Sequence, residues 1–178
     1  MVDVLESSGG FSRQLKLRAD FRAAEQKAKD VLREFGFDRP PIDPQFLSEQ
    51  LGVTVFFAEF DEASRGVSGF YDPEDLTIYV NKNDPPVRQT FTIAHELGHH
   101  LMHAEWAKSS DYKVLMRNTE VAQDPYEQEA NAFAAHLLVP ADMLKSYKSL
   151  AGVQDLARLF MVSVPVIRNR LDFESRRG

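Results

Sequence analysis

The run His95-Glu96-Leu97-Gly98-His99 matches the pattern HExxH. On a helix its two histidines stand one turn apart on the same face, so both imidazoles can reach a single metal ion. Glu96 is offset from them by roughly 100° and lies beside that ion, where its carboxylate can hold a water molecule and accept its proton. The run is therefore typical of a zinc-dependent hydrolase, with His95 and His99 as metal ligands and Glu96 as the catalytic base.

The neighbouring sequence predicts that this run belongs to a helix. Asp84 is a candidate cap for free backbone N–H groups, Pro85 suits the first turn, and the helix should continue to about residue 104. Both histidines border an apolar stripe with three- and four-residue spacing, which consists of Phe91, Ala94, Leu97, Gly98, Leu101 and Met102. The alternative is that the histidines are ordinary core residues, but burying two imidazoles and a carboxylate is costly without a metal or hydrogen-bond partners.

A catalytic zinc ion usually takes three protein ligands, so a third ligand is needed. His103 continues the one-turn spacing, but it lies about 12 Å along the helix axis from His95, whereas zinc–nitrogen bonds are about 2 Å long. His100 points about 100° away around the helix. Zincins with a third histidine continue as HExxHxxGxxH, and Met102 and Glu105 stand where that pattern requires glycine and histidine. The remaining option is a carboxylate from a second helix.

Residues 124–140 have the boundaries of such a helix. Asp124 suits the cap position, Pro125 suits the first turn, and Pro140 ends the run. The buried stripe of this helix should consist of Ala130, Phe133, Ala134, Leu137 and Leu138.

Glu129 lies at the margin of that predicted stripe, whereas Glu127 and Gln128 should point toward solvent. A carboxylate at such a margin is usually a surface residue. Opposite an HExxH helix, however, it is placed to complete a metal site, so we expect Glu129 to be the third ligand.

Two blocks of the sequence resemble the ImmA/IrrE metallo-endopeptidase family. The first block is HELGHHLMH at residues 95–103, and the second is EANAFA at 129–134, which runs into LVP at 138–140. Both blocks occur in the order that the family has them. The resemblance covers about residues 20–140, because the two blocks and the elements before them fall in that range.

Carried over by position, the resemblance implies that His95, His99 and Glu129 hold a zinc ion and that Glu96 is the catalytic base. It also implies a zincin-like metalloprotease fold with one zinc ion per chain. Members of the family are bacterial, phage and mobile-element proteins, and the studied ones relieve transcriptional repression by cleaving a partner repressor with a helix-turn-helix domain. We therefore expect a protein substrate of that kind and a role in transcription regulation, in a stress response or in a mobile element.

The composition is compatible with a single soluble globular protein of this kind. The chain has 178 residues, of which 43% are hydrophobic and 27% are charged. No signal peptide and no apolar run of membrane-spanning length is visible, so we expect no membrane association. The absence of cysteine excludes disulfides and thiolate metal sites and fits a cytoplasmic protein. The net charge of −6 argues against nucleic acid as the main partner.

The sequence divides into three predicted segments, with an α+β fold overall. Residues 1–17 have little periodicity and indicate a flexible tail, 18–148 form the metallopeptidase domain, and 149–178 form a helical hairpin. Before the HExxH helix, the patterns predict helices at 18–36 and 43–51 and strands at 53–58, 66–71 and 76–81. We expect a small antiparallel sheet packed on the helices. Its exposed edge could bind an extended peptide as an added strand, or the sheet could be purely structural.

The C-terminal hairpin resembles a helix-turn-helix unit, with a short turn near residues 161–163. In a DNA-binding version the second helix would enter the major groove, and Arg168, Asn169 and Arg170 could contact DNA or a protein partner. We favour a packing hairpin of the protease domain, because a single unit with few basic residues would bind DNA weakly.

The predicted reaction is the hydrolysis of a peptide bond, in which Glu96 takes a proton from water and returns it to the leaving amine. A further group must stabilise the oxyanion, and the sequence offers Tyr71, Tyr79, Tyr126 and His136 without ranking them. Two alternatives stay open: a regulatory binding protein that keeps the zincin fold without cleavage, and a DNA-binding regulator that acts through the C-terminal helices. Nitrogen and carboxylate ligands also accept manganese, iron or cobalt in place of zinc.

Overall fold

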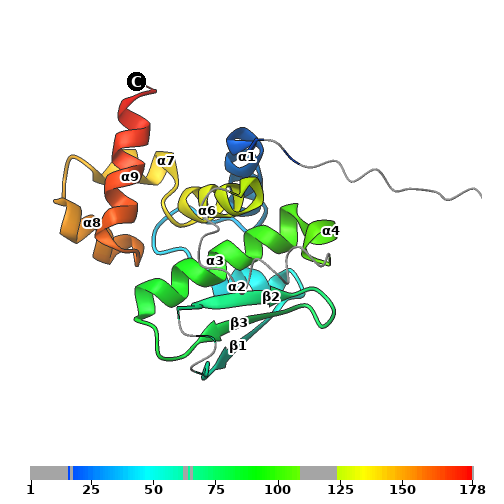
Figure 1. Ribbon diagram of the computed structural model, residues 1–178. Coiled ribbons are helices and arrows are strands. Elements are labelled where there is room, and N and C mark those ends of the chain that lie inside the picture. Colours follow the sequence, from blue (N-terminus) through cyan, green and yellow to red (C-terminus); the bar gives the residue numbers. More distant parts are fainter. Residues whose placement is uncertain (1–15, 17, 62–63, 65, 109–123, 178) are drawn as a thin grey trace, which may run out of the picture.

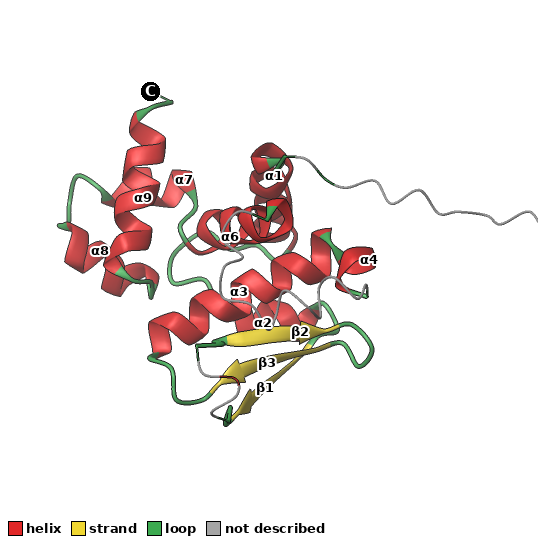
Figure 2. Cartoon of the chain, in the orientation of Figure 1, coloured by secondary structure: helices red, strands yellow, loops and turns green. Residues whose placement is uncertain are grey.

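A computed structural model describes residues 16, 18–61, 64, 66–108 and 124–177. A small sheet lies at one side of the molecule, and helices α2 (Pro44–Gln50) and α3 (Pro86–Met102) pack on it (Figure 1). Helices α1 (Phe21–Glu34) and α6 (Pro125–Leu138) lie beyond α3 (Figure 1). The C-terminal helices gather away from the sheet (Figure 2). The helix-rich α+β fold is confirmed, whereas the predicted tail at 1–17 lies outside the described residues apart from Lys16.

The sheet has three strands, β1 (Thr54–Ala58), β2 (Gly69–Asp72) and β3 (Thr77–Asn81), in the order β1-β3-β2. The expected antiparallel pairing is confirmed for β2 and β3. The sheet as a whole is nevertheless mixed, because β1 pairs with β3 in parallel. After β1 the chain passes to the opposite edge and forms β2 there, so the returning β3 enters between them and runs in the direction of β1.

Side chains point alternately to the two faces of the sheet, and the face that carries the apolar side chains packs against the helices. Ile78 and Val80 are fully buried, and Tyr71 of β2, which pairs with Ile78, is buried on the same face. Tyr79 lies on the other face, where it stacks on Phe70 with ring centroids 4.8 Å apart. The apolar face therefore supports the helix that carries the HExxH run.

That helix is α3 (Pro86–Met102), as the apolar spacing predicts. Its first turn differs from the expectation, because Pro85 is the N-cap residue and no side chain caps the helix. Asp84 instead lies 3.8 Å from Arg88 as an ion pair. A second proline at position 86 occupies the first helical position and moves the start of the helix one residue away from Asp84.

The second predicted helix is α6 (Pro125–Leu138), and its boundaries are confirmed: the Asp124 side chain accepts a hydrogen bond from the Tyr126 N–H at 2.8 Å. It packs against α3 and against α1 (Phe21–Glu34). Gly98 permits this packing, because a Cβ at that position would lie 3.4 Å from Ala130 Cα and 3.0 Å from the Phe133 ring. The close approach brings the polar side chains of α6 to the histidines of α3.

The remaining helices complete the core. They are α2 (Pro44–Gln50), α4 (Ala104–Ala107), α7 (Ala141–Tyr147), α8 (Val153–Phe160) and α9 (Val164–Ser175). The predicted C-terminal hairpin is α8 and α9, which turn at Met161 in the left-handed region and bury Leu156, Phe160 and Ile167. Within the described ranges, no helix combines the length and the apolar character needed to cross a bilayer.

Candidate metal centre

The two HExxH histidines point their Nε2 atoms at the same place. The Nε2 atoms of His95 and His99 are 3.1 Å apart, and the carboxylate of Glu127 from α6 lies against both. Glu127 Oε2 is 3.2 Å from Nε2 of His95, and Oε1 is 3.2 Å from Nε2 of His99. Among the described residues, these three are the group of histidine and acidic side chains whose ligand atoms all lie within 4.8 Å of one another.

The spacing of these atoms fits a metal ion. A tetrahedral zinc ion with bonds of about 2.0–2.1 Å holds neighbouring ligand atoms about 3.3 Å apart. The Nε2 atoms of His95 and His99 are 3.1 Å apart, and each lies 3.2 Å from a different oxygen of the Glu127 carboxylate. Two imidazole nitrogens and one carboxylate oxygen also form a usual donor set for a catalytic zinc ion.

Glu127, rather than Glu129, supplies the carboxylate of this group. The expectation that Glu127 points to solvent is wrong, because its side chain is only 21% exposed and contacts both histidines. The structure does not bring Glu129 to the Nε2 atoms of His95 and His99. Glu129 is buried on another face of α6, where it binds Nε2 of His103 at 2.8 Å, Lys16 at 2.5 Å and the backbone N–H of Asp20.

A sequence signal for Glu127 exists in its spacing to Asn131. These two polar residues stand one helical turn apart, as His95 and His99 do, so they share a face of α6. In the structure this face meets α3, and Asn131 Oδ1 lies 3.0 Å from Nδ1 of His95. Sequence reasoning missed this role of Asn131.

The electrostatics of the group follow from burial and mutual contact. Burial alone would raise the pKa of Glu127, but hydrogen bonds with His95 and His99 outweigh it and hold the pKa well below its ordinary value. Burial lowers the pKa of His99 to about 4, so this imidazole is neutral at pH 7, as a metal ligand must be. Burial alone would lower the pKa of His95, but its hydrogen bond with Glu127 and the charge of the buried Glu96 on the same helix outweigh this and raise the pKa.

Two of the four oxyanion candidates have other hydrogen-bond partners. The Tyr71 hydroxyl lies 2.8 Å from Nδ1 of His100, on the side of α3 that faces the sheet. The Tyr79 hydroxyl donates to Asp75 at 3.0 Å, on the sheet face that the helices do not cover. Neither contact places the hydroxyl at the three-residue group.

The other two candidates lie on α6. The Tyr126 ring stacks on Trp106 at 4.5 Å and meets the edge of His103 at 5.1 Å, and Trp106 in turn stacks on His99 at 5.2 Å. The structure therefore brings Tyr126 into the ring cluster beside the metal group. His136 instead lies against Phe173 at 5.3 Å.

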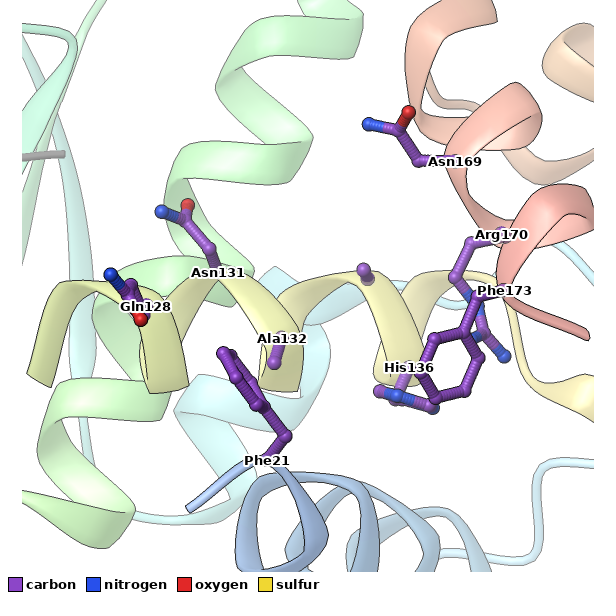
Figure 3. Close-up of a pocket in the computed structure, with 9 residues that line it drawn as sticks. Phe21, Gln128, Asn131, Ala132, His136, Asn169, Arg170 and Phe173 are labelled. Carbon is purple, nitrogen blue, oxygen red and sulfur yellow. The ribbon is translucent and has the colours of Figure 1, made fainter. Parts of the chain in front are cut away.

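A groove of about 420 Å³ is lined by residues of α6 and of two further helices (Figure 3). It lies between α6, the start of α1 and the last helix, and His136 and Phe173 form its far end in the figure. Asn131, which binds His95, also lines it. Its further lining residues are Phe21, Gln128, Ala132, Ala135, Asn169 and Arg170.

The C-terminal residues that were predicted to contact DNA or a partner differ in their exposure to solvent. Arg168 and Asn169 are exposed. Arg170 is buried: its Nε donates to the Val139 carbonyl at 3.0 Å, and its guanidinium pairs with Glu174 at 2.9 Å. Arg170 therefore holds α9 against the end of α6 and does not present its charge to a partner.

Comparison with known proteins identifies the family of this chain. The profile of the IrrE N-terminal-like domain, a peptidase family, matches residues 48–172. The radiation response metalloprotease IrrE of Deinococcus deserti is 31% identical over 123 residues, which are 68% of this chain and 42% of that protein. An uncharacterized immunity region protein of Bacillus phage phi105 is 34% identical over 85 residues, which are 47% of this chain and 51% of the phage protein.

Among solved structures, a transcriptional regulator of Mycobacterium tuberculosis has the same fold, with a TM-score of 0.59 and 20% identity. The match covers 84% of this chain and 46% of the regulator. The chain thus spans about half the length of the first two curated relatives that it matches, or less. With more than two thirds of its residues matched by the family profile, the chain belongs to the ImmA/IrrE metallopeptidase family.

Proposed function

We propose that this protein is a zinc-dependent endopeptidase in which His95, His99 and Glu127 hold the metal and Glu96 is the general base. The observation that carries the proposal is the meeting of two helices at one point: two histidines from α3 and a carboxylate from α6 at 3.1–3.2 Å from one another. The metalloprotease name of the Deinococcus deserti relative supports it. Glu129, the ligand that the sequence suggested, is replaced by Glu127 in this proposal.

The residues of the chain divide the chemistry between them. A zinc ion held by the three ligands would supply a Lewis acid for the scissile carbonyl and lower the pKa of a bound water molecule. Glu96 takes the proton from that water and delivers it to the leaving amine. Tyr126 is our first candidate for the oxyanion donor, because its ring lies in the cluster around His99 and His103.

The substrate that we propose is a regulatory protein, specifically a repressor with a helix-turn-helix domain. The names of the relatives support a regulatory setting, since one is a radiation response protein and another belongs to a phage immunity region. A repressor is a cytoplasmic target, so the proposal places the enzyme in the cytoplasm. The edge strand β2 would hold the peptide, and the groove beside Asn131 would hold one of its side chains.

The test combines metal analysis with a cleavage assay. The purified protein, loaded with zinc and dialysed, is assayed on a proteome-derived peptide library and on purified helix-turn-helix repressors, with products read by mass spectrometry. We expect one zinc ion per chain and defined cleavage products. Glu96→Gln should keep the zinc ion and lose about 10²–10⁴-fold in rate, the usual contribution of a general base. Zinc binding without any cleavage by the unaltered protein would instead support a regulatory binding protein.

A further inference from the structure

The two ring nitrogens of His99 face different neighbours. Nε2 faces His95 and Glu127, whereas Nδ1 lies 3.1 Å from Nδ1 of His103. A nitrogen that binds a metal must offer its lone pair, so the single proton of a neutral metal-binding His99 belongs on Nδ1. That Nδ1–H then donates to His103.

The direction of this hydrogen bond sets the next one. His103 accepts at Nδ1, so its own proton must lie on Nε2, which is 2.8 Å from Oε2 of Glu129. Glu129 is in turn held by Lys16 at 2.5 Å and by the backbone N–H of Asp20. Both of these partners are donors, so Glu129 is kept as an ionised acceptor that can receive the His103 proton.

We propose that Glu129 and His103 form a positioning relay, in which hydrogen bonds fix the ring orientation and the tautomer of His99 so that Nε2 is offered to the metal. This inference rests on the proposed function, because it assigns roles around the same metal site. Neither residue touches the metal or the substrate in this scheme. His103 and Glu129 are both buried, where a hydrogen bond is electrostatically stronger than in water.

His95 has a separate anchor. Its Nδ1 lies 3.0 Å from Oδ1 of Asn131, which can only accept, so the His95 proton is also held on Nδ1 and Nε2 is free for the metal. The two histidines are thus set by two independent arms, one through Asn131 and one through His103 and Glu129. Both arms begin on α6, the helix that supplies Glu127.

The experiment measures zinc affinity by competition with a chelator, for the full chain and for Glu129→Ala, His103→Leu and the double variant. Groups that orient a metal-binding histidine are worth about 10–100-fold in metal affinity, so each single variant should weaken zinc binding by that factor. Because the two residues act in series, the double variant should bind zinc about as weakly as His103→Leu alone. His103→Leu combined with Asn131→Ala should instead show the product of the two losses.

Three further measurements separate positioning from a structural role. His103→Gln keeps a side chain that can both accept and donate, so it should recover part of the affinity that His103→Leu loses. Glu25→Ala is the matched control, because it removes another buried, ion-paired carboxylate that lies on α1 and binds Lys29 and Arg177. The visible spectrum of the cobalt-loaded protein should change in Glu129→Ala and stay unchanged in Glu25→Ala. Circular dichroism establishes that each variant is folded.

The outcomes are distinct from those that test the proposed function. Zinc affinities of Glu129→Ala and His103→Leu within twofold of the unaltered protein, with an unchanged cobalt spectrum, would overturn the relay. Equal losses in Glu25→Ala would overturn it as well, since they would trace the effect to general destabilisation. If the unaltered protein binds no zinc, the proposed function fails before the relay is tested, and no variant is needed to show it.

Discussion

Gly98 of α3 and Ala130 of α6 mark the point of closest packing between the two helices that build the metal group. A Cβ on Gly98 would lie 3.4 Å from the Cα of Ala130 and 3.0 Å from the Phe133 ring. A branched side chain at this position therefore has no room. His95 and His99 belong to α3 and Glu127 belongs to α6, so the distance between the two helices also sets the distance between the metal ligands.

We therefore expect Gly98→Val to lower the free energy of unfolding by about 1–3 kcal/mol, as overpacking does, and to weaken zinc binding at the same time. Urea denaturation and chelator competition measure the two effects. Arg88→Val is the control, because it places the same side chain on an exposed position of α3. An unchanged stability of Gly98→Val would show that α6 can move away without cost.

Glu127→Ala should remove the third ligand and weaken zinc binding by more than about 100-fold, the upper end for groups that act only through a ligand. Gln128→Ala, one position along α6, should leave the affinity unchanged. Isothermal titration with zinc measures both. If Glu127→Ala bound zinc normally while Glu129→Ala bound none, the ligand would be Glu129 after all.

The ion-paired carboxylate of Glu25 should make stability depend on pH. Burial alone would raise the pKa of Glu25, but hydrogen bonds from Lys29 and Arg177 outweigh it and lower the pKa from 4.5 to about 2. A carboxylate with a lowered pKa stabilises the folded state above pH 4.5, and this contribution is lost as the pH falls from 4.5 toward 2.

Since Lys29 and Arg177 are half-exposed, we expect only about 1 kcal/mol from this contribution. Glu25→Gln should be less stable than the unaltered protein at pH 7 by that amount, and the difference should vanish near pH 2. Denaturation curves at several pH values test this, with the exposed Glu34→Gln as control. A difference that stays constant with pH would contradict the assignment.

The groove beside Asn131 should govern the choice of substrate side chain. Ala132→Trp would place an indole in the groove, so we expect a lower kcat/KM on the peptides that the unaltered protein cleaves, with zinc affinity unchanged. Cleavage profiles on the peptide library measure the effect. Ala141→Trp, on α7 and outside this groove, serves as control. Identical profiles for both variants would exclude the groove from substrate binding.

The sequence was sufficient to predict α3 and α6, because apolar spacing and the flanking prolines mark their faces and ends. It placed Glu129 at the margin of the buried stripe and Glu127 toward solvent, because the contact of Glu127 with the two histidines depends on how α6 crosses α3. Periodicity describes one helix and contains no crossing angle. The parallel pairing of β1 with β3 was missed for a similar reason, because it depends on the route that the chain takes between the strands.

One helix, α6, carries Glu127, Glu129 and Asn131 at alternate positions of a single rigid segment. A shift of α6 by one residue along its axis, or a rotation about it, would withdraw the carboxylate and both histidine anchors in the same movement. In the unaltered protein, the carboxylate and both histidine anchors would then be lost together and not one at a time. A loss of metal affinity would therefore indicate that α6 has moved from its position against α3.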